Sequence, residues 1–335
     1  MWPTETGRFA LGDLTLQSGA TLPGAVLSWK THGRLSPGRD NVVLYPTSYS
    51  AQHPDLEWLI GPDGVLDPER WFIVIPDMFG NGLSSSPSNS PAWPALVTAH
   101  DNVHAQRRLL RDVWGIERLH AVYGWSMGAQ QAYHWAALYP DAVARAIVNC
   151  GSARTATHNR VFLKGLMAVL EAAPEHLGEG RFARQPEAAL RAFGRIYAGW
   201  ALSQDFYRAD LHLTALGAPD LDTFLHTDWE ARFARRPAAD LYAQLRTWDA
   251  GDISSAPQFG GDLVRALGAI EARMLLMPGE TDLYFRVADN AAELPHLRDA
   301  TLCPIPSIWG HRAGNASTNP DDAAFLKQVV RDWLE

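Results

Sequence analysis

The stretch Leu119–Gly128 joins a short apolar run to a serine flanked by glycines. Leu119-His120-Ala121-Val122-Tyr123 leads into Gly124-Trp125-Ser126-Met127-Gly128, and the Ala-rich segment Met127–Tyr139 ends before Pro140. This order predicts a buried strand, a sharp turn and a helix. The glycines leave room for such a turn, which presents the serine hydroxyl above the carboxyl end of the strand. We therefore interpret Ser126 as a nucleophile, although a plain tight turn has the same G-x-S-x-G spacing.

Outward from this stretch, short apolar runs closed by Gly or Pro alternate with amphipathic segments. The further predicted strands are Asn41–Tyr45, Trp71–Ile75, Ala144–Asn149 and Arg273–Met277, and the further predicted helices are His100–Trp114, with Thr98 as its cap, and Asp321–Trp333. Continuous apolar runs of this length are typical of parallel strands buried on both faces. Alternation of residue types over Phe9–His32 favours an antiparallel hairpin at the sheet edge. The fold class predicted is α/β, with a mostly parallel, doubly wound sheet.

The segment 153–267 departs from this rhythm, because it is rich in Ala and Arg and has no convincing buried strand. We expect it to form a helical cap, or lid, inserted into a core made of residues 1–152 and 268–335. The tryptophans of the segment favour an apolar or aromatic acyl substrate, although a Trp at helical spacing is more often core than pocket.

A serine nucleophile needs a base, and in the strand–turn–helix arrangement the order along the chain is Ser, acid, His. His311 lies late in the chain, in a loop flanked by Gly310 and Gly314. His296, in Leu294-Pro295-His296-Leu297, is the alternative and is expected in a surface connection. His311 is the predicted base.

The acid should hold the imidazole in one tautomer and stabilise its protonated form. Asp282 follows the strand Arg273–Met277 by a few residues, which places it at the carboxyl end of a strand. Glu280 is the nearest competitor and Asp252 a more distant one. Asp282 is the predicted acid.

Acyl transfer also needs backbone N–H donors for the oxyanion that develops on the substrate. One donor should be Met127, directly after the nucleophile. The other should lie in the loop after Asn41–Tyr45, where we favour Tyr49, with Ser48 close behind. Ser48, Trp125 and Arg312 are further predicted to contact the substrate.

Composition excludes several other classes of protein. The formal net charge of −8 and the lack of any basic run argue against nucleic acid as a partner. No segment is long and apolar enough to span a bilayer, and Met1-Trp2-Pro3-Thr4-Glu5 lacks the pattern of a signal peptide, so a cytoplasmic location is expected.

The two cysteines, Cys150 and Cys303, are expected to be buried structural thiols in a reducing compartment. The C-x-x-C and H-E-x-x-H spacings of metal sites do not occur in the sequence, so neither a metal nor a cofactor is expected.

Taken together, these landmarks resemble the homoserine O-acetyltransferase group of the α/β-hydrolases. The stretches that carry the resemblance are Asn41-Val42-Val43-Leu44, Trp71–Ile75, Asn81–Pro87, Val97-Thr98, Ala105-Gln106-Arg107, Gly115-Ile116, Trp125–Ala132, Thr281–Phe285 and Gly310-His311. The resemblance implies the α/β-hydrolase fold with a helical cap. It also implies a triad of Ser126, Asp282 and His311, and a homodimer with cap helices at the contact.

Two positions depart from the family pattern. The acetyltransferases follow the catalytic His with an Asp for the homoserine amine, where this chain has Arg312. They also carry an Arg for the homoserine carboxylate in the first cap helix, where this chain has Leu166-Met167. An ammonium and a carboxylate buried without partners are costly, so the substrate is predicted to be other than homoserine.

The function predicted is hydrolysis of an ester, thioester or amide of a small to medium acyl substrate through an acyl-enzyme on Ser126. The alternative is an O-acyltransferase that moves an acyl group from acyl-CoA to an alcohol other than homoserine, with the acyl-CoA as co-substrate. The same fold also occurs in non-catalytic binding modules. The complete set of serine, acid and histidine in the expected order argues against such a module here.

Overall fold

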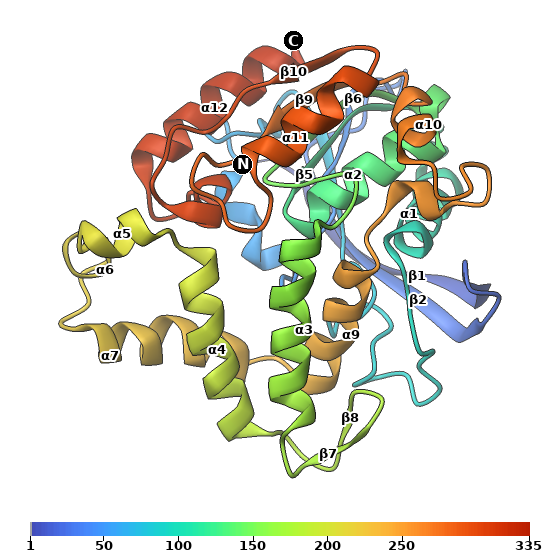
Figure 1. Cartoon of the computed structure of the whole chain (residues 1–335). Coiled ribbons are helices and arrows are strands. Elements are labelled where there is room, and N and C mark those ends of the chain that lie inside the picture. Colours follow the sequence, from blue (N-terminus) through green and yellow to red (C-terminus); the bar gives the residue numbers. More distant parts are fainter. Residues whose placement is uncertain (1) are drawn as a thin grey trace.

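The computed structural model describes residues 2–335, which fold around an eight-stranded sheet (Figure 1). In spatial order the strands are β1 (Thr4–Thr15), β2 (Thr21–His32), β4 (Phe72–Pro76), β3 (Val42–Leu44), β5 (Leu119–Trp125), β6 (Val143–Asn149), β9 (Arg273–Met277) and β10 (Ala300–Leu302). The pairs β1–β2 and β2–β4 are antiparallel, and every other pair is parallel. The mostly parallel sheet with an antiparallel hairpin at its edge is therefore confirmed, while β10 was not predicted.

The helices in chain order are α1 (Ala99–Trp114), α2 (Met127–Leu138), α3 (Thr157–Glu171), α4 (Glu187–Ala201), α5 (Gln204–Arg208), α6 (Leu211–Thr214), α7 (Leu221–Phe224), α8 (Ala231–Ala234), α9 (Ala238–Asp249), α10 (Leu263–Gly268), α11 (Val287–Glu293) and α12 (Pro320–Leu334). Thr98 caps α1, as predicted: its hydroxyl accepts from the N–H of Asp101, whose carboxylate accepts from the N–H of Thr98. Gly115, with φ of 63°, ends the same helix.

Both faces of the sheet are buried, which explains the continuous apolar runs of its parallel strands. Alternate residues point to opposite faces of a strand. Val43 and Tyr123 belong to a core that includes α12 and the aromatic residues between β6 and β9. Val42 and Val122 belong to a second core, which includes α1 and α2. The carboxyl ends of β3, β5, β6 and β9 therefore lie between two fixed layers.

The chain between β6 and β9 contributes no strand to the main sheet among the described residues. It contains α3 to α10 and a small hairpin of β7 (His176–Gly178) and β8 (Arg181–Phe182). In Figure 1, α3, α4 and α9 stand together below the sheet, and α3 packs on both of the others. The boundaries of a cap at residues 153 and 267 stay a prediction.

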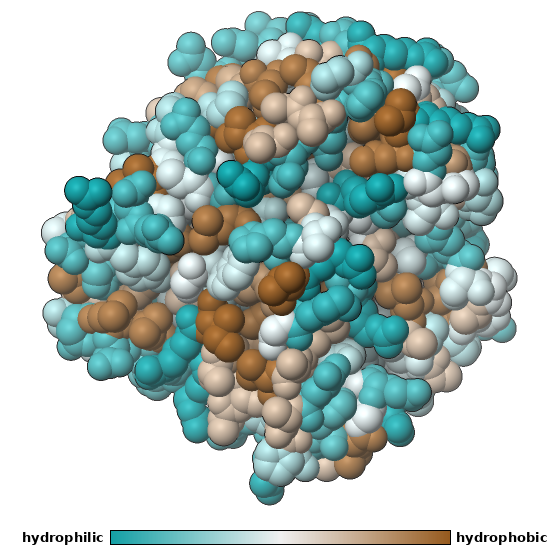
Figure 2. All heavy atoms as spheres, in the orientation of Figure 1, coloured by the Kyte–Doolittle hydropathy of each residue, from teal (hydrophilic) through white to brown (hydrophobic). Residues whose placement is uncertain are grey.

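Few large apolar side chains reach the surface. On the face in Figure 2, hydrophobic residues form small patches separated by hydrophilic ones. Val161 on α3 and Leu177 on β7 are the most exposed large apolar residues described. No helix within residues 2–335 has the length and apolarity needed to cross a membrane. The homodimer stays a prediction.

The expectation for the cysteines is correct for Cys150, which is buried, and wrong for Cys303, which is only partly buried. Cys303 directly follows β10 at the edge of the sheet, where no further strand covers it. An edge position leaves one flank of a residue open to solvent, which its apolar sequence neighbours do not reveal.

At Gly124, strand β5 and helix α2 pack backbone against backbone. A Cβ on Gly124 would sit 2.1 Å from the carbonyl oxygen of Gly128 in α2. We predict that Gly124→Ala lowers the free energy of unfolding by at least about 2 kcal/mol, because backbone atoms must move. Urea unfolding measures the change. The matched control is Gly165→Ala in α3, where a Cβ meets no atom within 4 Å; it should raise stability by about 0.5–1 kcal/mol. Equal effects of the two substitutions would contradict the packing described.

Glu293 ties the end of α11 to the segment that follows β6. Its carboxylate accepts from the N–H of Ala153 (2.8 Å), the hydroxyl of Tyr133 (2.7 Å) and the amide of Asn290 (2.8 Å). Burial nevertheless raises the pKa of Glu293 to about 7, well above the usual value of 4.5 for a glutamate. Folding thus favours the protonated form of Glu293. The protonated carboxyl contributes fully to stability below pH 4.5, and this contribution is lost as the pH rises towards 7.

We therefore predict that Glu293→Gln removes a pH-dependent contribution of up to about 3 kcal/mol. Between pH 4.5 and 7 the free energy of unfolding of the native chain should fall relative to that of the variant. Urea unfolding at several pH values measures both, with the exposed Glu117→Gln as control. Parallel curves for the native chain and Glu293→Gln would show that this carboxyl titrates normally.

Candidate active site

Ser126 occupies the turn between β5 and α2 in a strained backbone conformation. Its φ of 59° and ψ of −126° are rarely adopted by a residue with a side chain. The backbone N–H of Ser126 donates to the carbonyl of Asn149 at the end of β6 (3.0 Å). The residue is 2% exposed. The turn thus holds the hydroxyl at the carboxyl edge of the sheet, at the start of α2.

Asp282 and His311 form a hydrogen-bonded pair beside this turn. Oδ2 of Asp282 lies 2.7 Å from Nδ1 of His311. Because an ionised carboxylate only accepts hydrogen bonds, Nδ1 carries the proton and Nε2 is left as the acceptor. The second oxygen, Oδ1, accepts from the backbone N–H groups of Tyr284 (2.7 Å) and Phe285 (3.2 Å). Both oxygens of the carboxylate are therefore fixed.

Three aromatic rings pack against the imidazole of His311. The ring of Trp125 stacks on His311 at 5.0 Å between centroids, and Tyr284 and Phe285 lie at 4.9 Å and 5.6 Å. Nε2 is buried and forms no hydrogen bond to any described residue, Ser126 included. Bonds between a base and a nucleophile are often long before substrate binds and shorten in the complex. Nε2 is thus left as a free acceptor at the cavity.

Cys150, at the end of β6, is a neighbour that the sequence did not point to. Its sulfur, a carboxylate oxygen of Asp282 and a ring nitrogen of His311 lie within 4.8 Å of one another. Burial, and then the charge of Asp282, raise the pKa of the Cys150 thiol well above its usual value. The sulfur therefore packs behind the pair as a neutral thiol.

The alternative acids and base lie elsewhere. His296 lines a different cavity, together with Glu293 and Arg154. Glu280 is exposed. Asp252 forms a salt bridge with Arg154 (2.7 Å) and caps a short 3-10 turn. The structure thus brings together the three residues predicted as a triad, and their catalytic roles stay predictions.

The loop after β3 carries the predicted oxyanion donors. Ser48 and Tyr49 both line the cavity that contains Ser126, and their backbone N–H groups have no acceptor among the described residues. The neighbouring N–H of Ser50 is already bonded to Gln244 (2.8 Å). Met127 is the first residue of α2, where helical N–H groups have no partner within the helix. The choice between Ser48 and Tyr49 stays open, and the ring of Tyr49 stacks on Tyr197 of α4.

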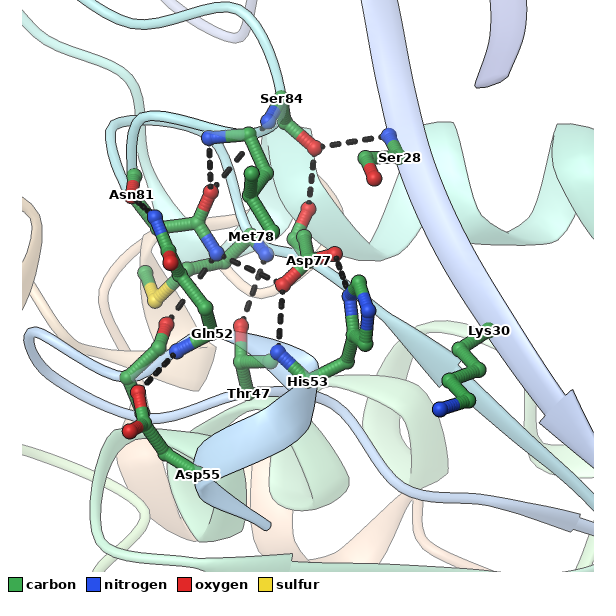
Figure 3. Close-up of polar contacts among 12 residues, drawn as sticks. Ser28, Lys30, Thr47, Gln52, His53, Asp55, Asp77, Met78, Asn81 and Ser84 are labelled. Atoms are coloured by element: carbon green, nitrogen blue, oxygen red, sulfur yellow. Dashed lines mark hydrogen bonds and ion pairs between the residues drawn. The ribbon is translucent and has the colours of Figure 1, made fainter. Parts of the chain in front are cut away.

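A buried polar network lies beneath this loop (Figure 3). Asp77, fully buried just after β4, accepts from the backbone N–H (2.9 Å) and Nδ1 (2.8 Å) of His53 and from the amide of Asn81 (2.9 Å). Asn81 also donates to the carbonyl of Ala51 (3.1 Å). The hydroxyl of Thr47 accepts from the N–H of Met78 (2.8 Å). The loop is thus fastened at both ends to the chain that follows β4.

Ser126 and His311 open onto a cavity of about 260 Å³. The predicted substrate contacts Ser48, Trp125 and Arg312 all line it, while Leu166 and Met167 do not. Several further lining residues were not predicted, namely Tyr197, Trp229, Arg232, Phe233 and Arg235. They come from the segment between β6 and β9, and no motif marks them in the sequence.

The chain belongs to the α/β-hydrolase fold family, whose sequence model matches residues 58–307. Within that family it is a member of the homoserine acyltransferase-like group. It is 36% identical to an ethyl acetate hydrolase of Pseudomonas veronii, over 90% of this chain and 87% of that protein. It is 29% identical to a homoserine O-succinyltransferase of Paraburkholderia xenovorans, over 90% of this chain and 89% of that protein.

Among solved structures, the chain is similar to an acetylester hydrolase from Corynebacterium glutamicum, with a TM-score of 0.90 and 32% identity. The match covers 98% of this chain and 96% of that one. The chain is therefore an enzyme of the α/β-hydrolase class, as the sequence predicted.

The network around Asp77 should stabilise both the fold and the loop after β3. Asp77→Asn places an amide against donors, so we expect a loss of about 2–4 kcal/mol in the free energy of unfolding. We also expect faster hydrogen exchange at residues 50–53, whose N–H groups are hydrogen-bonded, because the variant loosens their attachment. The exposed Asp63→Asn is the control and should change stability by less than about 0.5 kcal/mol. Native protection of residues 50–53 in Asp77→Asn would refute the role given to the network.

Proposed function

We propose that the chain hydrolyses esters of short carboxylic acids through an acyl-enzyme on Ser126. The observation that carries the proposal is the bonded Asp282–His311 pair, which leaves Nε2 as the free acceptor beside a nucleophile in a strained turn. The similarity to an ethyl acetate hydrolase and to an acetylester hydrolase supports ester cleavage, and acetyl as the reference acyl group.

In the first half of the reaction, the hydroxyl oxygen of Ser126 attacks the ester carbonyl while its proton passes to Nε2 of His311. The positive charge on the imidazole is balanced by Asp282 at Nδ1. The oxyanion accepts hydrogen bonds from the N–H of Met127 and from an N–H of the loop after β3, for which Tyr49 is our choice. Collapse of the tetrahedral intermediate releases the alcohol, which takes the proton from Nε2.

In the second half, a water molecule gives its proton to Nε2 and attacks the acyl-serine. The intermediate breaks to the carboxylic acid, and the proton returns from Nε2 to the oxygen of Ser126. The same three residues thus act twice, with His311 alternating between base and acid.

The size and walls of the cavity favour a small ester. Its volume of about 260 Å³ lies below the usual range of sites for drug-sized ligands. Tyr197 and Phe233 form an apolar wall, and Ser48 and Asn315 add polar groups. An acetyl or similarly short acyl group matches this volume.

A second candidate is O-acyl transfer from acyl-CoA to an alcohol. It is supported by the similarity to a homoserine O-succinyltransferase. The two candidates share the acyl-enzyme and differ in what attacks it. Arg312 stands where the acetyltransferases are expected to carry an Asp, which argues against homoserine as the acceptor.

The proposal predicts the kinetics of two variants with 4-nitrophenyl acetate and ethyl acetate. Ser126→Ala should lower kcat at least about 10⁴-fold, because the nucleophile is removed. Asp282→Asn should lower kcat by about 10³- to 10⁴-fold, because the imidazole loses its tautomer control. His296→Asn is the control for the alternative base and should stay within about twofold.

Acetyl-CoA with a panel of simple alcohols separates the two candidates. Release of acetate from the esters, with no acetylated alcohol formed, supports hydrolysis. Acetylated alcohol in preference to acetate would favour the transferase instead. Native ester turnover by Ser126→Ala would remove the basis of both.

A further inference from the structure

The wall of the cavity carries more positive than negative charge. Three arginines line it, Arg232, Arg235 and Arg312, against one carboxylate, Asp55. The enzyme as a whole is acidic, with a net charge of −8. Positive charge is thus concentrated where the ester must bind, although the rest of the molecule has the opposite sign.

Asp55 pairs with one arginine of the cavity lining and with neither of the other two. It bonds to Arg235 (3.1 Å) and to Arg236, which lies outside the cavity lining (2.8 Å). Within residues 2–335, neither Arg232 nor Arg312 forms a salt bridge. The one side-chain hydrogen bond of Arg312 goes to the neutral hydroxyl of Thr318 (3.0 Å).

Arg232 and Arg312 reach the cavity from two different parts of the fold. Arg232 lies on α8, between β6 and β9, with its guanidinium 5.7 Å from the ring of Trp229. Arg312 follows His311 in a short 3-10 helix, Gly310–Gly314, with its guanidinium 5.9 Å from the ring of Trp309. Both arginines therefore line the same cavity as Ser126 and His311.

The side chain of Arg232 reaches solvent and that of Arg312 is half-buried, and the two positive charges repel each other. Burial, and then repulsion by Arg232, lower the pKa of Arg312 to about 10. Burial and repulsion by Arg235 likewise lower the pKa of Arg232. Asp228 attracts both without forming an ion pair. Like charges held near each other cost free energy, which a bound anion relieves.

We propose that Arg232 and Arg312 form a subsite for an anionic group, carboxylate or phosphate, on a substrate ester. The inference rests on the proposed ester hydrolysis and names the substrate class. Guanidinium groups match such anions with paired hydrogen bonds. The preferred substrate is thus an ester that carries a negative charge in its alcohol part or in its acyl part, away from the scissile bond.

Matched pairs of charged and neutral esters test the subsite. For the alcohol part the pair is 4-acetoxybenzoate and 4-acetoxybenzamide. For the acyl part it is the mono-4-nitrophenyl ester of glutaric acid and 4-nitrophenyl pentanoate. The readout is the ratio of kcat/KM, charged over neutral, corrected for spontaneous hydrolysis. We expect a ratio of roughly ten or more in one pair, which identifies the part that carries the charge.

The variants separate the subsite from general damage to the neighbouring His311. Arg232→Gln and Arg312→Gln should each lower the ratio at least about fivefold, because one charged bond is lost. Arg312→Lys keeps the charge and should give an intermediate ratio. Arg235→Gln tests the third arginine of the lining: because that arginine is already paired with Asp55, its ratio should change less than twofold. Thermal melting confirms that each variant is folded.

The outcomes distinguish the inference from the proposed function. A ratio near one in the native enzyme, or a ratio unaffected by Arg232→Gln and Arg312→Gln, would overturn the subsite while Ser126-dependent turnover of neutral esters leaves the hydrolase intact. Failure to cleave any of the four esters would contradict the proposed function, and the subsite with it. Loss of the ratio in Arg235→Gln alone would assign the anion to a different arginine and refute this pair.

Discussion

The contact between Gly124 and the first turn of α2 is the constraint on which the site depends. No side-chain atom fits between β5 and the backbone of Gly128, so the chain reverses abruptly and Ser126 takes up a positive φ. Gly128 in turn lies so near the carbonyl of Pro46 that a Cβ there would approach it to 2.6 Å. The start of α2 therefore fixes both Ser126, the proposed nucleophile, and the loop with the proposed oxyanion donors.

The sheet order converts this local geometry into a site. β5 lies between β3 and β6, and β9 lies next to β6. Because these strands are parallel, their carboxyl ends meet at one edge. The edge gathers the loop with Tyr49, the turn with Ser126 and the approach to Asp282. Two buried polar anchors then set the positions finely: Asp77 beneath the loop, and Asp282 with its backbone donors beside His311. The segment between β6 and β9 supplies the remaining wall of the cavity.

Local sequence patterns predict most of the fold. The five predicted parallel strands are all present within about two residues, since each is an apolar run closed by Gly or Pro. β10 has three residues and no apolar run, so pattern alone does not reveal it. The residues Ser126, Asp282 and His311 were found by their order and their place after strands. Asp77 also lies directly after a predicted strand and Pro76, so its position in the sequence could have marked it in the same way. Arg232 has no such mark in the sequence, because only the folding of the long segment between β6 and β9 brings it to the cavity.

The central claim is that Ser126 carries the acyl group, and intact-mass analysis tests it most directly. The enzyme is mixed briefly with 4-nitrophenyl acetate, quenched in acid, and the peptide that bears any added mass is sequenced. The account predicts one acetyl group per chain, on Ser126, and none in Ser126→Ala. In a His311 variant that has been acylated with excess ester, the acetyl group should be longer-lived. Steady turnover of the ester with no acetyl group on Ser126, or with the group on another residue, would contradict it.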